Sequence, residues 1–268
     1  MTQWIRVSIV MWPFAATLLA ASSALAQAPP PPPPPPPPVV TVTVDPAQPL
    51  QGRWSVEFAV GFDNSISGNI NSSGIGTLNN QAVVIMRNRY EDVYGTGLHL
   101  RFGGGYMLDE DVEVRATFSL QSLDAELTPM GDLGVSRLYG QYADYQSFGL
   151  DVGLRQYHAL SPLLRAYGEG TVGLAFIDET NVILVAPSAN VVRNATDFYD
   201  KTAAFTFGGN VGILMQTTSN FGVFGQLGIR WVSGMSEIDD LAVTGLETIN
   251  DKSARWTMPF LMGVRARF

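Results

Sequence analysis

The sequence predicts an all-β protein, an antiparallel up-and-down β-barrel whose strands cross a membrane. Apolar and polar residues alternate with a period of two in successive segments between Gly52 and Phe268, which is the pattern of half-buried strands. Beyond the extreme N-terminus no run of about 18 apolar residues occurs, so no spanning helix is predicted. Charged residues still make up only 15% of the chain, against roughly 25% in an average soluble domain. A low charge content without an apolar helix favours a barrel in lipid.

The N-terminus has the layout of a cleaved secretory signal over residues 1–26. One basic residue, Arg6, precedes an apolar stretch from Val7 to Ala21. Ala24 and Ala26 then supply the small residues of a cleavage site. A retained anchor is the alternative, but the apolar stretch is short for a spanning helix. We therefore expect an exported protein.

A proline-rich segment, residues 27–50, follows the signal. Pro29–Pro38 are ten consecutive prolines, and such a tract forms a polyproline II rod of roughly 31 Å because it lacks amide donors and its φ is fixed. We expect it to act as a spacer in the periplasm, with a docking role as the alternative. The barrel domain is predicted for residues 51–268.

Eight segments carry the alternation, which agrees with the even strand number of bacterial outer-membrane barrels. In the first of them Trp54 and Val56 fall on one face and Glu57 on the other. The segments are residues 54–62, 94–106, 112–120, 148–154, 164–176, 205–215, 221–231 and 256–268. Val83–Met86 and Val182–Val185 are either hairpin extensions above the membrane or spanning strands, which would give ten or twelve. Pro259 lacks an amide donor, so a bulge or a local break is expected there.

The connections between these segments are alternately long and short. Alternation alone does not separate a membrane barrel from a soluble sandwich, but outer-membrane barrels combine short periplasmic turns with longer extracellular loops. This asymmetry predicts a membrane barrel with the proline tract and Phe268 on the periplasmic side. The long connections are residues 64–91, 125–144, 178–201 and 236–252, and the tight turns are 108–111, 159–162 and 217–220.

Aromatic residues of the apolar face concentrate near the segment ends, which predicts two girdles at the membrane interfaces. Those near the turn end are Trp54, Tyr106, Phe221 and Phe268. Those near the loop end are Phe62, Tyr94, Phe176, Phe205 and Trp256.

The polar face is rich in long side chains of opposite charge. Eight strands leave an interior just wide enough for side chains to fill, so we expect these residues to plug the lumen. Intervening glycines leave gaps, and a small pore or solute carrier is the alternative. The predicted lumen charge network contains Glu57, Arg101, Glu113, Arg115, Asp151, Arg155, Arg165, Glu169, Arg230 and Arg265. His99 is expected to be a polar filler of the same lumen.

The turn near Ser161 suggests a register for the lumen. Pairing His158 with Pro162 would set Asp151 opposite Glu169 and Arg155 opposite Arg165. Like charges directly opposite are destabilising, so compensation from the far wall is needed. We therefore expect Arg230 to bridge Asp151 and Glu169, with Glu57 and Glu113 answering the two arginines.

With these features the chain resembles the OmpA/OmpX-like small outer-membrane barrels of Gram-negative bacteria over residues 51–268. In that family the last strand is an assembly signal, and Gly263 and Phe268 match it, whereas Leu261 and Ala266 depart from it. The resemblance implies the barrel assembly machinery, outer-membrane lipid and lipopolysaccharide as partners. We expect no peptidoglycan-binding domain after the barrel, and the proline-rich segment precedes the barrel instead of following it.

Composition excludes several function classes. Without cysteine there is no thiolate metal site or thiol nucleophile, and two histidines leave little for imidazole chemistry. The acidic balance, with a net charge of −8, argues against nucleic acid as a partner. No catalytic, cofactor-binding or metal-binding constellation is visible, so we expect no cofactor and no enzyme. The predicted role is structural or surface-interacting, with an unidentified extracellular partner for the loops.

Overall fold

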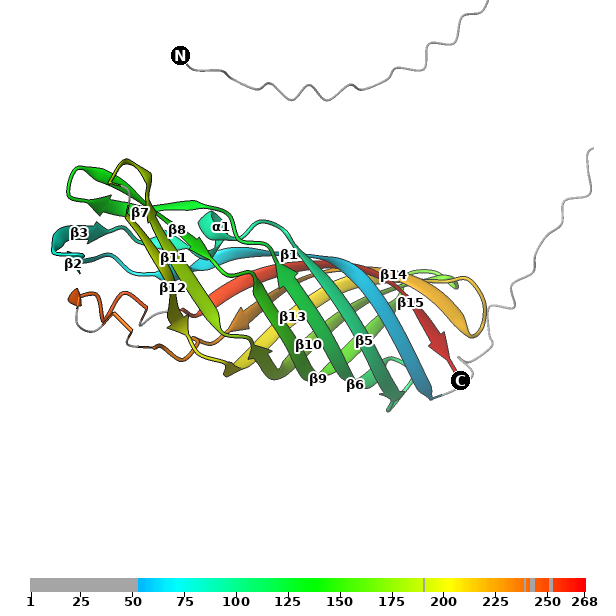
Figure 1. Ribbon diagram of the computed structural model, residues 1–268. Helices are drawn as coiled ribbons and strands as arrows, with labels where there is room; N and C mark the ends of the chain where they lie inside the picture. Colours follow the sequence, from blue (N-terminus) through cyan, green and yellow to red (C-terminus); the bar gives the residue numbers. More distant parts are fainter. Residues whose placement is uncertain (1–52, 190, 239, 242–243, 251–252) are drawn as a thin grey trace, which may run out of the picture. The chain divides into compact units, whose positions relative to one another are not determined.

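The structure is a computed structural model that describes residues 53–268 apart from 190, 239, 242–243 and 251–252 (Figure 1). By its contacts the chain divides into two units, Met1–Val44 and Asp45–Phe268. The predicted signal peptide with its cleavage site at Ala24 and Ala26, and the proline-rich segment 27–50, lie outside the described residues. The account below therefore concerns the second unit.

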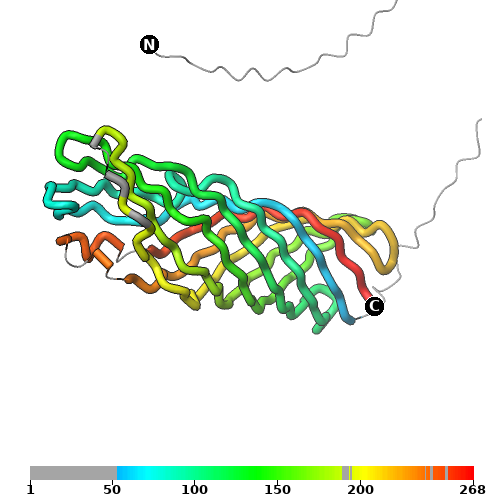
Figure 2. Tube along the Cα trace, in the orientation of Figure 1, coloured from blue at the N-terminus to red at the C-terminus, as the bar shows by residue number. Residues whose placement is uncertain are grey.

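Eight long antiparallel strands form a closed barrel (Figures 1 and 2). In hydrogen-bonding order they run β15-β14-β13-β10-β9-β6-β5-β1, and β1 also pairs with β15 from Ser55–Arg267 to Gly68–Arg255. The prediction of an eight-stranded barrel is confirmed. The strands are β1 (Trp54–Asn71), β5 (Gly97–Met107), β6 (Val112–Leu123), β9 (Tyr145–Ala159), β10 (Leu164–Ile177), β13 (Thr202–Gln216), β14 (Phe221–Val232) and β15 (Arg255–Arg267).

The outer wall of the barrel is apolar and its inner wall is polar. In β6, Glu113 and Arg115 are buried inside, whereas Val114 and Phe118 are exposed at 40% and 36%. Large apolar side chains on the outside would be unfavourable in water but are required in lipid, where closure also leaves no strand edge unpaired. The barrel therefore has the construction of a membrane-spanning one. No helix in the described part of the chain has the length and apolar character to cross a bilayer.

The first three long connections form a second, six-stranded sheet at the end of the barrel opposite the C-terminus (Figure 2). The segments Val83–Met86 and Val182–Val185 could have been either hairpin extensions or spanning strands. Val83 lies in β3 and Val182 in β11, both in this second sheet, so the two segments are extensions. With the short β4 (Asn88–Arg89), α1 (Tyr90–Val93), η1 (Pro187–Ala189) and the described residues of 233–250 we call this region the cap. Its strands are β2 (Gly74–Leu78), β3 (Gln81–Ile85), β7 (Thr128–Leu133), β8 (Ser136–Tyr142), β11 (Thr180–Ala186) and β12 (Val191–Tyr199).

In the cap the apolar side chains face inward, whereas in the barrel they face outward. Val182, Leu184 and Ala186 alternate inward on β11 and are at most 2% exposed. They join Ile70 and Phe198, both 0% exposed, in one apolar cluster. A sheet with water outside places its apolar face inward, which explains this arrangement.

The fourth long connection fills the gap between the two edges of the cap sheet. Its Leu246 and Ile249 are 1% exposed and belong to the same apolar cluster. The Ser72 amide donates to the Ile249 carbonyl (2.6 Å) on one side, and the Asp197 amide donates to an Asp240 carboxylate oxygen (3.3 Å) on the other. The connection thus covers edges that would otherwise offer unpaired backbone groups.

Pro259 interrupts one ladder without shifting its register. Pairing between β14 and β15 stops at Leu227–Phe260 and resumes at Arg230–Thr257 in the same register. The expected local break is present because proline has no amide to donate. The alternative, a bulge, occurs instead in β1 between Ser65 and Ser67.

Truncation of Phe198 should loosen the cap and leave the barrel folded. This ring is 0% exposed and packs edge-on against Tyr142, with ring centroids 5.7 Å apart. Removing a buried phenyl group costs about 3–5 kcal/mol. We expect Phe198→Ala to make the cap sensitive to protease in the refolded protein, while the barrel fragment resists digestion.

The matched control is Val135→Ala, since Val135 is fully exposed at the tip of a cap hairpin and its loss should change nothing. An equal fall of the cap and barrel unfolding temperatures in Phe198→Ala would show instead that the two parts unfold as one unit.

Candidate functional site

Inward-facing charged residues from five strands meet inside the barrel. Each sits at an inward position of the alternation, which is why the polar face of the sequence collects in one narrow lumen. Six of them are joined by ion pairs, and we call this group the lumen network. Its members are Glu57 on β1, Glu113 and Arg115 on β6, Arg155 on β9, Glu169 on β10 and Arg265 on β15.

Glu57 is the centre of the lumen network. Its carboxylate accepts from Arg115 Nη2 at 2.5 Å, from Arg155 Nη1 at 2.6 Å and from Arg265 Nη1 at 3.2 Å. These side chains are at most 3% exposed. Since β1 and β9 are separated by β5 and β6, the pair of Glu57 and Arg155 crosses the lumen.

The other two carboxylates extend the network. Glu169 accepts from Arg155 Nη2 at 2.6 Å and from Arg115 Nη1 at 2.8 Å. Glu113 accepts from Arg265 Nη2 at 2.6 Å and from the Tyr157 hydroxyl at 2.7 Å. Buried ion pairs of this kind are costly to break, because removal of one partner leaves an uncompensated charge.

The register between β9 and β10 differs from the expected one. Ala159 pairs with Arg165, and residues 160–163 form a four-residue turn in which the Leu164 amide donates to the Ser161 hydroxyl. Arg155 consequently lies opposite Glu169, and not opposite Arg165. The predicted pairing of like charges was therefore wrong, because the turn is centred two residues further along the chain than expected, which shifts the register and sets opposite charges side by side.

Outside the lumen network the remaining predicted charges have separate partners. Arg230 lies 3.2 Å from Asp151, whereas its expected second bridge to Glu169 is not formed. Arg101 donates to the Gln226 side-chain oxygen at 2.6 Å. Arg165 is half-buried at the turn end, 3.9 Å from the Asp111 carboxylate, so the pairing with Glu113 expected for it is also absent.

Three further charged residues, which the sequence interpretation did not assign to the charge network, face the lumen. They are Asp63, Arg255 and Arg267. Their alternation was visible, but their partners come from distant segments. The Arg255 guanidinium lies 3.9 Å from the Tyr145 ring centroid and 5.1 Å from that of Tyr90 in α1. Asp63 accepts hydrogen bonds from Gln121 and, at 3.1 Å, from Thr257.

At the turn end the predicted aromatic residues lie on the outer wall. Trp54 packs edge-on against Tyr106, with ring centroids 4.8 Å apart. Phe221 and Phe268 are exposed at 42% and 64%. Rings in these positions suit the polar and apolar boundary of a bilayer.

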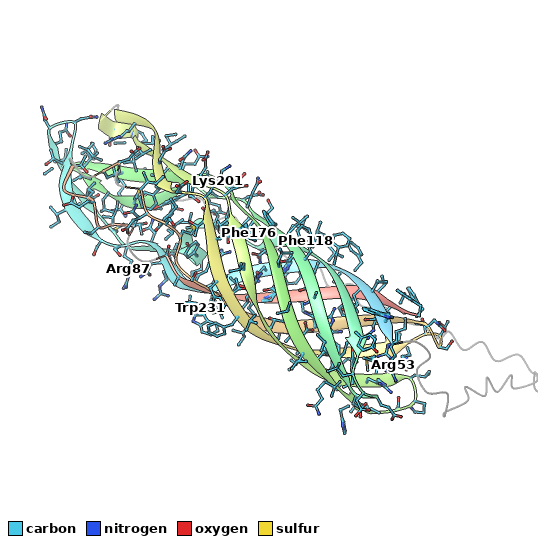
Figure 3. The ribbon with its side chains drawn as sticks, turned by 90° about the horizontal axis from the view of Figure 1, so that it is seen from below. Arg53, Arg87, Phe118, Phe176, Lys201 and Trp231 are labelled. Atoms are coloured by element: carbon cyan, nitrogen blue, oxygen red, sulfur yellow. The ribbon has the colours of Figure 1, made fainter. Side chains whose placement is uncertain are left out.

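At the loop end all but one of the predicted aromatic residues also face outward. Phe62, Phe205 and Trp256 are exposed, and Phe176 stacks on Phe148 at 4.6 Å. Figure 3 shows Phe118, Phe176 and Trp231 on the outer wall between Arg53 near the turn end and Lys201 near the cap.

Tyr94 is the exception, and its assignment to a girdle was wrong. It is 3% exposed inside the cap cluster, and its hydroxyl donates to the Ala143 carbonyl at 3.0 Å. The residue precedes β5, which begins at Gly97, so the strand alternation does not extend to it. The apolar cluster of the cap takes it inward instead.

The phenols inside the cap are neutral hydrogen-bond donors. Burial raises the pKa of Tyr90, Tyr142 and Tyr199 far above the usual phenol range. Tyr142 donates to Asn71 Oδ1 at 2.8 Å, and Tyr199 donates to the Ile70 carbonyl at 2.5 Å. These bonds fasten the end of β1 to the cap strands.

The two residues of the predicted assembly signal lie on the closing seam. Phe268 and Trp54 exchange backbone hydrogen bonds of 3.1 and 3.2 Å. A side chain at Gly263 would collide with the Phe58 carbonyl of β1 and with the Phe224 ring. Both positions thus have a packing role in closure, and recognition by assembly machinery stays a prediction.

Within the described residues no group of three or more His, Asp or Glu side chains is placed to hold a metal ion. No family model and no curated protein sequence matches the chain. Structures with a similar backbone have been solved. Neisserial surface protein A has 9% identity and a TM-score of 0.44, with 80% of this chain and 97% of that chain covered.

Two further similar structures are OprG and OmpT. The outer membrane protein OprG from Pseudomonas aeruginosa has 11% identity and a TM-score of 0.40. The outer membrane protease OmpT from Escherichia coli has 9% identity and a TM-score of 0.45. In both comparisons 81% of this chain and 97% of the other are covered. The function of this chain has to be sought in its own residues.

Removing Arg155 should destabilise the barrel far more than removing an exposed arginine. Its guanidinium is 0% exposed and bonds both Glu57 and Glu169, so Arg155→Gln leaves two carboxylates short of charge. A loss of about 3–5 kcal/mol is expected for a buried pair. Thermal unfolding of the refolded barrel in detergent, followed by circular dichroism, measures it.

Arg137→Gln is the control, because Arg137 and its partner Asp132 are both more than 40% exposed and such pairs contribute about 0–1 kcal/mol. Adding Glu169→Gln to Arg155→Gln should restore part of the loss. Equal unfolding temperatures for Arg155→Gln and Arg137→Gln would show that the lumen network does not stabilise the barrel.

Proposed function

We propose that this protein is a non-catalytic anchor of the bacterial outer membrane: a barrel whose lumen is plugged by its own side chains and which presents a folded cap for surface interactions. The observation that carries this proposal is the set of ion pairs across the lumen, from Glu57 to Arg155 and from Glu169 to Arg115. Side chains that bond each other across the lumen leave no continuous aqueous path.

The interior of the barrel supports plugging at both ends. Towards the turns, the lumen network fills the cross-section of the lumen, and Arg265 forms ion pairs with both Glu57 and Glu113. Towards the cap, apolar side chains such as Ile70 and Phe198 cover the mouth. A cavity between these two regions, lined by Arg101 and Arg230, has a volume of only about 30 Å³.

The cap supports a role in surface interactions. It is a folded β-structure with its own apolar cluster, so it can hold a binding surface in a defined shape. Two of its hairpins place apolar side chains outward, with Ile75 exposed at 76% and Val135 fully exposed. Exposed apolar side chains at the tips of hairpins are available for contact with a partner.

The orientation of the barrel in the membrane follows from the connections at its two ends, which are short turns at one end and long segments at the other. Short turns lie on the periplasmic side of outer-membrane barrels and long segments lie outside. We infer that the cap is extracellular, that the proline-rich segment 27–50 enters from the periplasm, and that the two aromatic girdles sit at the lipid and lipopolysaccharide interfaces.

Planar-bilayer recordings test plugging. The refolded full chain should show no discrete openings, since the lumen network closes the section. A variant with Arg115→Ala, Arg155→Ala and Glu169→Ala removes the crossing pairs and should conduct, which shows that the assay detects an open barrel. Steady openings by the unaltered protein would establish a pore and refute the plugged anchor.

Cysteine labelling on intact cells tests orientation, and the native chain has no cysteine to interfere. We expect Val135→Cys at the tip of a cap hairpin to react with an impermeant maleimide. Ser161→Cys, in an exposed turn at the other end, should react only after the outer membrane is permeabilised. The reverse pattern would place the cap in the periplasm.

A further inference from the structure

A small polar cavity remains inside the barrel on the cap side of the lumen network. Its volume is about 30 Å³. Two guanidinium groups, those of Arg101 and Arg230, border it, as do His99 and Ser119. Asp151 is its only charged partner of opposite sign among the described lining residues. The wall of the cavity is therefore net positive.

The whole lumen also has an excess of positive charge. Seven arginines are buried there: Arg101, Arg115, Arg155, Arg230, Arg255, Arg265 and Arg267. Five carboxylates face them: Glu57, Asp63, Glu113, Asp151 and Glu169. Burying unbalanced charge is unfavourable unless a counter-charge or water is at hand.

Arg101 borders the cavity and forms no direct ion pair with a described residue. No carboxylate of the described chain lies within ion-pair distance of it, and its guanidinium donates to the Gln226 side-chain oxygen at 2.6 Å. The same Gln226 oxygen accepts from the Tyr167 hydroxyl at 3.1 Å, which fixes its position. Arg101 is thus held in place with donors left over, because a guanidinium carries five N–H groups.

Neutral polar groups on the cavity wall lack partners as well. Ser119 is 2% exposed and His99 is 3% exposed. The Ser119 hydroxyl and both ring nitrogens of His99 have no hydrogen-bond partner among the described residues. Buried polar atoms without partners in one place indicate a ligand or ordered solvent.

We propose that this cavity binds one small monovalent anion of halide size, such as chloride, between Arg101 and Arg230. The ion accepts from both guanidinium groups and from the Ser119 hydroxyl, and it supplies part of the negative charge that the lumen lacks. Arg230 can contribute because the contacts to Asp151 use only its Nη2. Bonds between an ionised donor and an anion are the strong class of hydrogen bond.

The size of the cavity restricts the ligand. A water molecule needs about 10–15 Å³ of such space, so the cavity takes one halide with at most a water beside it. Larger anions such as gluconate do not fit. The site requires only the lumen geometry and does not depend on the anchoring role, and binding of water alone is the alternative outcome.

The test uses full-length protein unfolded in urea and refolded in detergent with either chloride or gluconate at equal ionic strength. Ligand that binds the folded state alone raises the unfolding temperature. We expect a midpoint about 2–4 °C higher in chloride for the unaltered protein. Arg101→Gln should lose this difference, whereas the exposed Arg137→Gln should keep it. Equal midpoints in both salts for the unaltered protein would mean that the cavity holds water alone.

A second variant covers the possibility that Arg101→Gln fails to fold. Ser119→Val keeps every charge, fills part of the cavity and removes its hydroxyl donor, so it should also lose the chloride response. If Ser119→Val responds to chloride as fully as Arg137→Gln does, the effect arises elsewhere and the site is refuted. Crystals soaked in bromide provide the direct readout, with an anomalous peak between Arg101 and Arg230 expected and peaks confined to the outer surface contradicting the proposal.

Discussion

The absence of water around the middle of the barrel is the constraint on which the other features depend. Each backbone N–H and C=O at that depth must find a partner within the chain, and closure through the β1–β15 pairing provides it. Closure turns one face of every strand inward. The polar residues of eight strands are then confined in a lumen too narrow for bulk water, so they have to satisfy one another.

Arginine is well suited to that confinement. The planar guanidinium group of Arg155 reaches Glu169 with two of its nitrogens and Glu57 with a third, which a lysine ammonium on a flexible stem would do less specifically. All seven buried cations of the lumen are arginines. Arg155 and Glu169 are neighbours on the adjacent strands β9 and β10. The expected like-charge pair of Arg155 and Arg165 therefore does not form, and no residue from the opposite side of the lumen is needed to compensate it.

The sequence was enough to predict the strand number and the inward and outward faces, because alternation depends on local order alone. It was not enough for features that depend on a turn or on distant partners. The turn around Ser161 is centred two residues further along the chain than expected, so Arg155 lies opposite Glu169 and not opposite Arg165. Arg255 lies on the polar face of its segment, but its partners could not be predicted because its aromatic neighbour Tyr90 lies 165 positions earlier, in α1. Tyr94 was misplaced for the related reason that the cap cluster is formed by several separate connections.

The reversal of polarity along the barrel axis explains how the membrane part and the cap can be one continuous structure. On β1, Phe58 and Val60 face lipid while Ile70 faces inward, and the Ser65/Ser67 bulge lies between them. A bulge adds one residue to one strand and so exchanges the faces of the alternation. Just where the environment changes from lipid to water, the strand therefore changes the side on which its apolar residues lie. Asp63, His99 and Arg255 occupy the inner face near this boundary, so the polar lumen ends where the apolar cap begins.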